Sequence, residues 1–225
     1  MEKFLCLALN LLIISIPLLA SFEHRINYAS KWYALFPAIL ITAVIFLKLD
    51  KSFTSIGVWR LNKRYLLGPT IFGLPVEEFL IFVTVPYSFV LIYEILNYYF
   101  HTDFFEILGK PFMHLVILLF LILGITNWNK RYTSINFLMA SATVAIHLYI
   151  FEVKIMSKFL LTFIVQLVPF FVCNGILTGS LTKEPVVIYN NSHNLGLRIG
   201  TVPIEDIIYT MTLLLMNVSL YEAFL

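Results

Sequence analysis

Seven stretches of this chain are apolar over about twenty residues, the length that an α-helix needs to cross the hydrocarbon core of a bilayer. Short polar segments separate them, and a break of only three residues, Asn129-Lys130-Arg131, divides the fourth stretch from the fifth. The pattern predicts an all-α integral membrane protein with seven transmembrane helices. We expect them at residues 4–22, 32–49, 78–100, 112–128, 132–151, 159–179 and 204–225.

The third and seventh stretches share one sequence pattern. Residues 75–94 align without a gap with residues 203–222, which lie 128 positions later. Matches between apolar residues are common among membrane helices, whereas matches of Pro, Gly and polar residues indicate an internal duplication. The identical pairs are Asn62/Asn190, Leu67/Leu195, Gly68/Gly196, Ile71/Ile199, Pro75/Pro203, Glu77/Glu205, Thr84/Thr212, Val90/Val218, Tyr93/Tyr221 and Glu94/Glu222.

The duplication divides the chain into two three-helix repeats, at residues 1–100 and 132–225, joined by a spacer helix within residues 101–131. Three spans are an odd number, so a direct fusion would invert the second repeat in the membrane. A spacer helix restores the orientation. We therefore expect the third and seventh helices to run parallel and adjacent, related by a pseudo-twofold axis along the membrane normal.

Composition and charge agree with a membrane protein. Only 12% of the residues are charged and 60% are hydrophobic, whereas soluble domains have about 25% charged residues. A net charge of +2, without a basic run, gives no sign of nucleic-acid binding. The two cysteines, Cys6 and Cys173, lie in apolar segments and indicate neither a disulfide framework nor a metal site.

Lys and Arg residues are about twice as frequent on the side of the N-terminus as on the opposite side. By the positive-inside rule, the N-terminus and both duplicated motifs are expected on the cytoplasmic side of the cell (inner) membrane.

Each duplicated motif places two adjacent acids at the start of a membrane helix: Glu77 and Glu78, then Glu205 and Asp206. One interpretation is helix initiation, because Pro suits the first helical turn and acids there interact favourably with the helix dipole. The other is catalysis, because burial and like-charge repulsion keep one carboxyl protonated as a general acid. The occurrence of two copies favours catalysis. Glu77 and Glu205 are the preferred proton donors, since they alone are identical, although the pattern leaves open which acid of each pair holds the proton.

Four further matched residues support the motifs. Thr84 and Thr212 lie seven residues after the motif glutamates, so each lies on the same helix face and either lines a cavity or bonds its own helix. Asn62 and Asn190 lie 15 residues before them and either orient a carboxyl group or fold the loop.

The two motif helices also share residues near their other end. Glu94 and Glu222 lie at the opposite interface and are expected to be anchors or inter-helix partners. Tyr93 and Tyr221 at this end, and Tyr209 nearer the second motif, are candidates for cation–π attraction.

The segments "LPVEEFLIF", "VPIED", "LIYE" and "NVSLYE" resemble the lycopene β-cyclases of the heterodimeric type, which occur as two small three-helix subunits or as one fused chain. Val76 stands where Ile is more usual in that family. The resemblance implies a redox-neutral cyclisation of the linear ends of lycopene to β-rings, started by an acid. It implies catalytic roles for the motif acids, no cofactor or metal, and a carotenoid substrate taken from the bilayer.

Two other functions fit the same residues. A carotenoid hydratase would use the same protonation and trap the cation with water. A proton-coupled transporter would also combine duplicated helices with membrane acids. The ring type, the number of ends cyclised and the formation of a homo-oligomer stay open.

Overall fold

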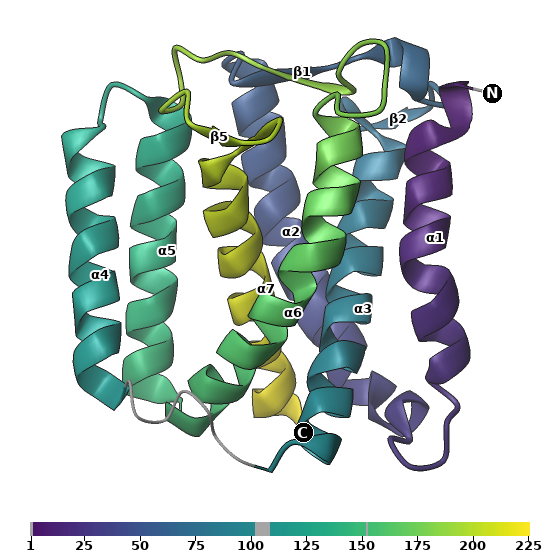
Figure 1. The fold of residues 1–225 in the computed structure, drawn as a ribbon, viewed down its shortest axis with the longest axis vertical. Helices are drawn as coiled ribbons and strands as arrows, with labels where there is room; N and C mark the ends of the chain where they lie inside the picture. Colours follow the sequence, from purple (N-terminus) through teal and green to yellow (C-terminus); the bar gives the residue numbers. More distant parts are fainter. Residues whose placement is uncertain (1, 102–108, 152) are drawn as a thin grey trace.

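The computed structural model describes residues 2–101, 109–151 and 153–225, and seven long helices form most of this part of the chain (Figure 1). All seven are long and apolar enough to cross a membrane, as the sequence predicts, so the protein is a multi-pass membrane protein. Their bounds are α1 Leu5–Ala20, α2 Trp32–Ser55, α3 Val76–Tyr99, α4 Gly109–Thr126, α5 Arg131–Ile150, α6 Val153–Leu177 and α7 Ile204–Phe224. Short 3₁₀ turns lie at Glu2–Phe4, Tyr28–Lys31 and Lys63–Tyr65.

Two helices are longer than the hydropathy pattern predicts. Helix α2 continues to Ser55 through a charged segment that the sequence suggested was a loop. Helix α6 begins at Val153 and passes through Asn174 and Gly175 without a break. Helices extend into the interface beyond the apolar core of the bilayer, which is where the hydropathy pattern ends.

Helices α3 and α7 begin at the same end of the bundle as the N-terminus and run in the same direction (Figure 1). They contact each other, which confirms the expected parallel and adjacent arrangement. The packing is equivalent in the two halves: α1 packs on α3 as α5 packs on α7, and α2 packs on α7 as α6 packs on α3. Helix α4 lies at the edge of the bundle and packs on α5, as a spacer would.

A short antiparallel strand pair joins the two loops at the motif end of the bundle. Strand β1, Trp59–Leu61, pairs with β4, Val187–Tyr189. Arg60 faces Ile188, and these residues are themselves 128 positions apart, so the pseudo-twofold axis passes between them. The flanking bonds repeat too, since the Asn62 N–H donates to the Val186 carbonyl and the Asn190 N–H donates to the Val58 carbonyl, each at 2.8 Å.

A crossed pair of side-chain hydrogen bonds joins the repeats at the opposite end. The Tyr93 hydroxyl donates to Glu222 at 2.5 Å, and the Tyr221 hydroxyl donates to Glu94. Lys31 adds an ion pair to Glu94 at 2.5 Å. The prediction of inter-helix partners for Glu94 and Glu222 is therefore confirmed.

Each motif helix follows directly from a two-residue β-hairpin turn. The hairpins are formed by β2, Thr70–Ile71, with β3, Leu74–Pro75, and by β5, Arg198–Ile199, with β6, Val202–Pro203. Gly73 and Gly200 in the turns have φ of 88° and 63°, a region that glycine adopts without strain. Pro75 and Pro203 are the N-cap residues and immediately precede the first helical residue. Each proline ends a hairpin strand and starts a helix at once.

Replacing Tyr93 with Phe tests the crossed hydrogen bonds. The change removes the hydroxyl that donates a hydrogen bond to Glu222 and leaves this half-buried carboxyl without that donor. Loss of such a bond costs roughly 1–3 kcal/mol of stability. We expect a lower thermal unfolding temperature in detergent. The effect should be smaller for Tyr221→Phe, because Glu94 still has its ion pair with Lys31. The exposed Tyr98→Phe serves as the control. A Tyr93→Phe protein as stable as the wild type would show that the crossed bonds do not hold the repeats together.

Candidate active site

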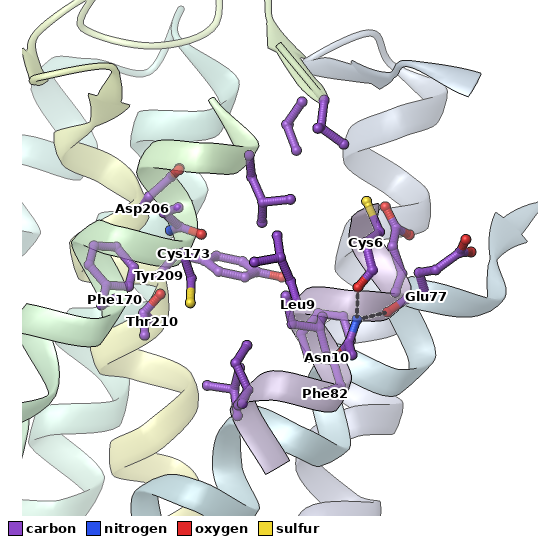
Figure 2. A pocket seen from close by; sticks show the side chains of 18 of the residues that line it. Cys6, Leu9, Asn10, Glu77, Phe82, Phe170, Cys173, Asp206, Tyr209 and Thr210 are labelled. Atoms are coloured by element: carbon purple, nitrogen blue, oxygen red, sulfur yellow. Dashed lines mark hydrogen bonds between the residues drawn. The ribbon is translucent and has the colours of Figure 1, made fainter. Parts of the chain in front are cut away.

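A cavity of about 300 Å³ lies between the two repeats, on the motif side of the membrane. Helices α1, α2, α3, α5, α6 and α7 all contribute to its wall, which is mostly apolar. Figure 2 shows Glu77 with Cys6 and Asn10 on one side, and Asp206 with Tyr209 and Thr210 across the cavity. Among the described residues that line it, four are acids and none is Lys, Arg or His. The four acids are Asp50, Glu77, Glu78 and Asp206.

The two identical motif glutamates attach their loops to their helices. Glu77 Oε1 accepts the Leu67 N–H at 2.6 Å, and Glu205 Oε1 accepts the Leu195 N–H at 2.7 Å. Leu67 and Leu195 are a matched pair, so the same bond occurs in both repeats. This shared structural bond accounts for the identity of the two glutamates.

The first helix of each repeat supplies an asparagine that the sequence analysis missed. Asn10 Nδ2 donates to the Glu77 carbonyl at 3.4 Å, and Asn136 Nδ2 donates to the Glu205 carbonyl at 2.6 Å. Both side chains are buried. A lone asparagine in an otherwise apolar segment was the available signal, and its partner could not be read from the sequence.

The matched threonines differ from each other. Thr84 donates to Asn10 Oδ1 at 2.9 Å, whereas Thr212 donates to the Ile208 carbonyl of its own helix. Neither is among the residues that line the cavity. The two threonines therefore support the helix starts and do not form a stripe facing a ligand.

Asn62 and Asn190 stabilise their loops. Asn62 Nδ2 donates to Glu184 at 2.9 Å and its Oδ1 accepts the Arg64 N–H. Asn190 Oδ1 accepts the Ser192 N–H and hydroxyl. Neither asparagine bonds a motif acid among the described residues, which favours the loop interpretation.

Adjacent acids of the second motif have different surroundings. Glu205 is fully buried, also accepts the Thr133 hydroxyl at 2.7 Å and does not line the cavity. Asp206 does line it, because consecutive residues of a helix point about 100° apart. The Tyr132 hydroxyl donates to Asp206 Oδ1 at 2.7 Å, and the Tyr189 hydroxyl donates to Oδ2 at 2.8 Å.

Tyr189 is fixed as a hydrogen-bond donor. Burial, followed by the adjacent Asp206 carboxylate, raises the pKa of Tyr189 well above its usual range. The phenol therefore keeps its proton at any physiological pH. Both Asp206 oxygens thus remain occupied by donors.

Glu78 holds the corresponding position in the first motif and has no such partners. It makes no hydrogen bond to any other residue in the described part of the chain, and its Oε2 atom is buried. Glu78 is therefore the one acid of the cavity wall whose carboxyl group no described side chain or backbone group holds in place.

A fourth acid, Asp50, comes from the end of α2 and was absent from the sequence-based candidates. It is buried, and the Tyr209 hydroxyl donates to its Oδ1 at 2.5 Å. The sequence placed Asp50 in a loop because the apolar run ends at Lys48. Of the tyrosines proposed for cation–π attraction, only Tyr209 lines the cavity.

The two repeats contribute unequal walls to this cavity. Six pairs of positions 128 residues apart line it, and most of them differ in chemical character between the repeats. At Leu61/Tyr189 and Ile81/Tyr209 the second repeat supplies a phenol where the first supplies an aliphatic residue. The other pairs are Trp59/Val187, Glu78/Asp206, Phe82/Thr210 and Val85/Leu213. The pseudo-symmetric halves therefore form one asymmetric site.

Comparison with known proteins gives the family. The lycopene cyclase family model matches residues 3–96 and 129–224, which is most of the chain. The chain belongs to the lycopene cyclase family. No curated protein and no solved structure matches it. As a lycopene cyclase family member, the protein belongs to carotenoid biosynthesis.

Glu205 allows a test of the structural bonds in this lycopene cyclase family member. Glu205→Ala removes the acceptor of the Leu195 N–H and of the Thr133 hydroxyl, and each buried group left unpaired costs roughly 1–3 kcal/mol. We expect a clear fall in thermal stability for Glu205→Ala and a smaller fall for Glu205→Gln, which keeps a carbonyl oxygen. Thermal unfolding in detergent measures both. Equal stability of the alanine variant and the wild type would contradict this role.

Proposed function

We propose that the protein converts the linear end groups of lycopene to β-rings, by a redox-neutral isomerisation that begins with a proton from Glu78. The observation that carries the proposal is an apolar cavity lined by four carboxyl groups and no basic residue among its described wall. The family match supports carotenoid cyclisation in general. The acid-initiated steps and the residue roles are our proposal.

The chemistry needs one proton and no redox partner. A proton adds to C2 of the terminal C1=C2 double bond and leaves the positive charge on C1. The electron pair of the C5=C6 double bond then forms the C1–C6 bond, which closes the six-membered ring and moves the charge to C5. Loss of the proton on C6 returns its electron pair as a new C5=C6 double bond. One proton enters and one leaves, so substrate and product are isomers.

Glu78 is the cavity acid best suited to give the first proton. Burying a charge among apolar groups costs much more than burying the neutral acid. Glu78 has neither a cation nor a hydrogen-bond donor among the described residues to offset that cost. Glu77 already accepts a loop amide, and Glu205 does not line the cavity. In this proposal Glu77 and Glu205 hold the loops, while Glu78 faces the substrate.

In this proposal the groups that stabilise the cation come mainly from the second repeat. Asp206 accepts two phenol hydroxyls, which hold its carboxyl oxygens across the cavity from the first motif. The aromatic rings of Trp59, Tyr132 and Tyr209 line the same wall, with centroids 5.3 Å apart for Trp59 and Tyr132 and 6.3 Å apart for Tyr132 and Tyr209. Each ring that faces a cation contributes roughly 0.5–2 kcal/mol.

The dimensions of the cavity suit one end group at a time. About 300 Å³ is at the small end of ligand pockets, which run from about 300 to 1,000 Å³. The wall includes Ile92, which lies 14 residues after Glu78 and so about 21 Å further along the helix at about 1.5 Å per residue. In this proposal the end group lies beside the acids and the polyene chain follows α3 away from the loops. Each end of lycopene therefore requires its own binding event.

The proposal also includes the orientation in the membrane. The motif end of the bundle lies on the cytoplasmic side of the cell membrane.

Glu78→Gln is the direct test of the proton donor. Gln keeps the shape of Glu but has no proton to give, and loss of a general acid typically lowers the rate about 10²–10⁴-fold. We expect a lycopene-producing bacterium that expresses the variant to stay red, while wild type and the exposed Glu23→Gln control turn yellow-orange. Chromatography with mass spectrometry measures the products, and membrane immunoblots confirm equal protein.

Other results would change the assignment. Wild-type rate in Glu78→Gln would exclude Glu78 as the donor, and loss of activity in Glu77→Gln alone would move the role to its neighbour. A wild-type product heavier than lycopene by one water would identify a hydratase. Unchanged lycopene with wild-type protein in the membrane would contradict the proposed function itself.

A further inference from the structure

Asp50 and Tyr209 form a held carboxyl group at the cavity wall. Both line the cavity, and the Tyr209 hydroxyl donates to Asp50 Oδ1 at 2.5 Å. The Tyr209 ring is itself packed, with its centroid 5.0 Å from Phe46 and 6.3 Å from Tyr132. Asp50 Oδ2 accepts no hydrogen bond from any described residue. Tyr209 therefore anchors one oxygen of Asp50, and the other oxygen has no described donor.

The last step of the proposed reaction requires a base in a defined position. The C5 cation has removable protons at three neighbours: C6, C4 and the methyl group on C5. Their loss gives the β-, ε- and γ-ring respectively, with the same atoms and no redox change. The ring type is therefore decided by which proton a base can reach, and a small displacement of a reacting group changes its rate strongly.

The other cavity acids are less suited to this selection. Both Asp206 oxygens already accept phenol hydroxyls. Glu78 has no partner among the described residues that would fix its position. Glu77 uses one oxygen to hold Leu67. Asp50 combines a free oxygen with a fixed position, on the wall to which the second repeat contributes its phenols.

We infer that Asp50 accepts the proton from C6 and thereby selects the β-ring, with Tyr209 as the residue that positions it. The oxygen of Asp50 that accepts no described hydrogen bond takes the proton, and the C6–H electron pair becomes the C5=C6 double bond. Each turnover thus moves one proton from Glu78 to Asp50. Asp50 then releases its proton to water and Glu78 takes a new proton from water before the next cycle. The inference rests on the proposed function and adds the group that ends the reaction.

The experiment compares ring types made by Asp50→Asn, Asp50→Glu and Tyr209→Phe, with the exposed Tyr33→Phe as the control. Each variant is produced in a lycopene-making bacterium and checked by membrane yield and thermal unfolding. Chromatography and NMR then determine the shares of β-, ε- and γ-rings. A parallel incubation in D₂O shows whether recovered lycopene gains deuterium, which reports protonation at C2 separately from ring completion.

We expect Tyr209→Phe and Asp50→Glu to keep cyclisation but to raise the share of ε- and γ-rings, by roughly tenfold or more, because the base has moved. Asp50→Asn should make little β-ring while its lycopene still gains deuterium. Tyr33→Phe should match the wild type in rate and ring type.

Two results would overturn the inference. The first is a product that contains only β-rings in all three variants, whatever their rate of cyclisation. This result would leave Glu78 as both proton donor and proton acceptor. The second is a folded Asp50→Asn protein that neither cyclises nor exchanges deuterium, which would place Asp50 in protonation. Failure of the proposed function is distinct, because the wild type would then form no ring at all.

Discussion

A carboxyl group buried among apolar side chains must be neutral, hydrogen-bonded or paired with a cation, because an isolated buried charge costs many kcal/mol. This constraint decides how each acid of the protein is used. At the end away from the motifs, Glu94 and Glu222 are held by tyrosines across the repeat boundary, and Lys31 adds a cation to Glu94. At the motif end, Glu77 and Glu205 accept loop amides. These four acids have structural partners.

Three further acids line the cavity between the repeats, and they differ in the number of their hydrogen-bond partners. Asp206 has two phenol donors, Asp50 has one, and Glu78 has none in the described part of the chain. The three carboxyl groups at one site therefore differ in how firmly they are held. In our proposal Asp206 stabilises the cation, Asp50 is the base and Glu78 is the acid. An acid-initiated cyclisation uses all three, which links the duplicated fold to the chemistry that we propose.

The sequence predicted the framework well because membrane helices and duplications leave local signals. Seven apolar runs gave seven spans, and the match between Glu77 and Glu205 predicted parallel α3 and α7. The helix ends were less accurate, since α2 continues past Lys48 into a charged segment. The antiparallel pairing of Arg60 with Ile188 could not be foreseen, because the bonds between those loops depend on the tertiary arrangement.

The candidate site was predicted only in part. Identity between copies favoured Glu77 and Glu205, but identical residues in a duplicated fold report what both copies share, which here is a loop attachment. The cavity residues differ between the repeats, as Ile81 and Tyr209 do, and so give no signal in a comparison of copies. To predict Asp50 as a site residue, one must know that α2 packs beside α7, and a single sequence does not provide that information.

The measurement that tests the account most directly is the position of deuterium in rings formed by the wild-type protein in D₂O. If a carboxylic acid that exchanges with solvent starts the reaction, each new β-ring gains one deuterium, located at C2. The product then weighs one mass unit more per ring than the product made in ordinary water. Rings that form at the normal rate without deuterium at C2 would contradict the acid-initiated mechanism.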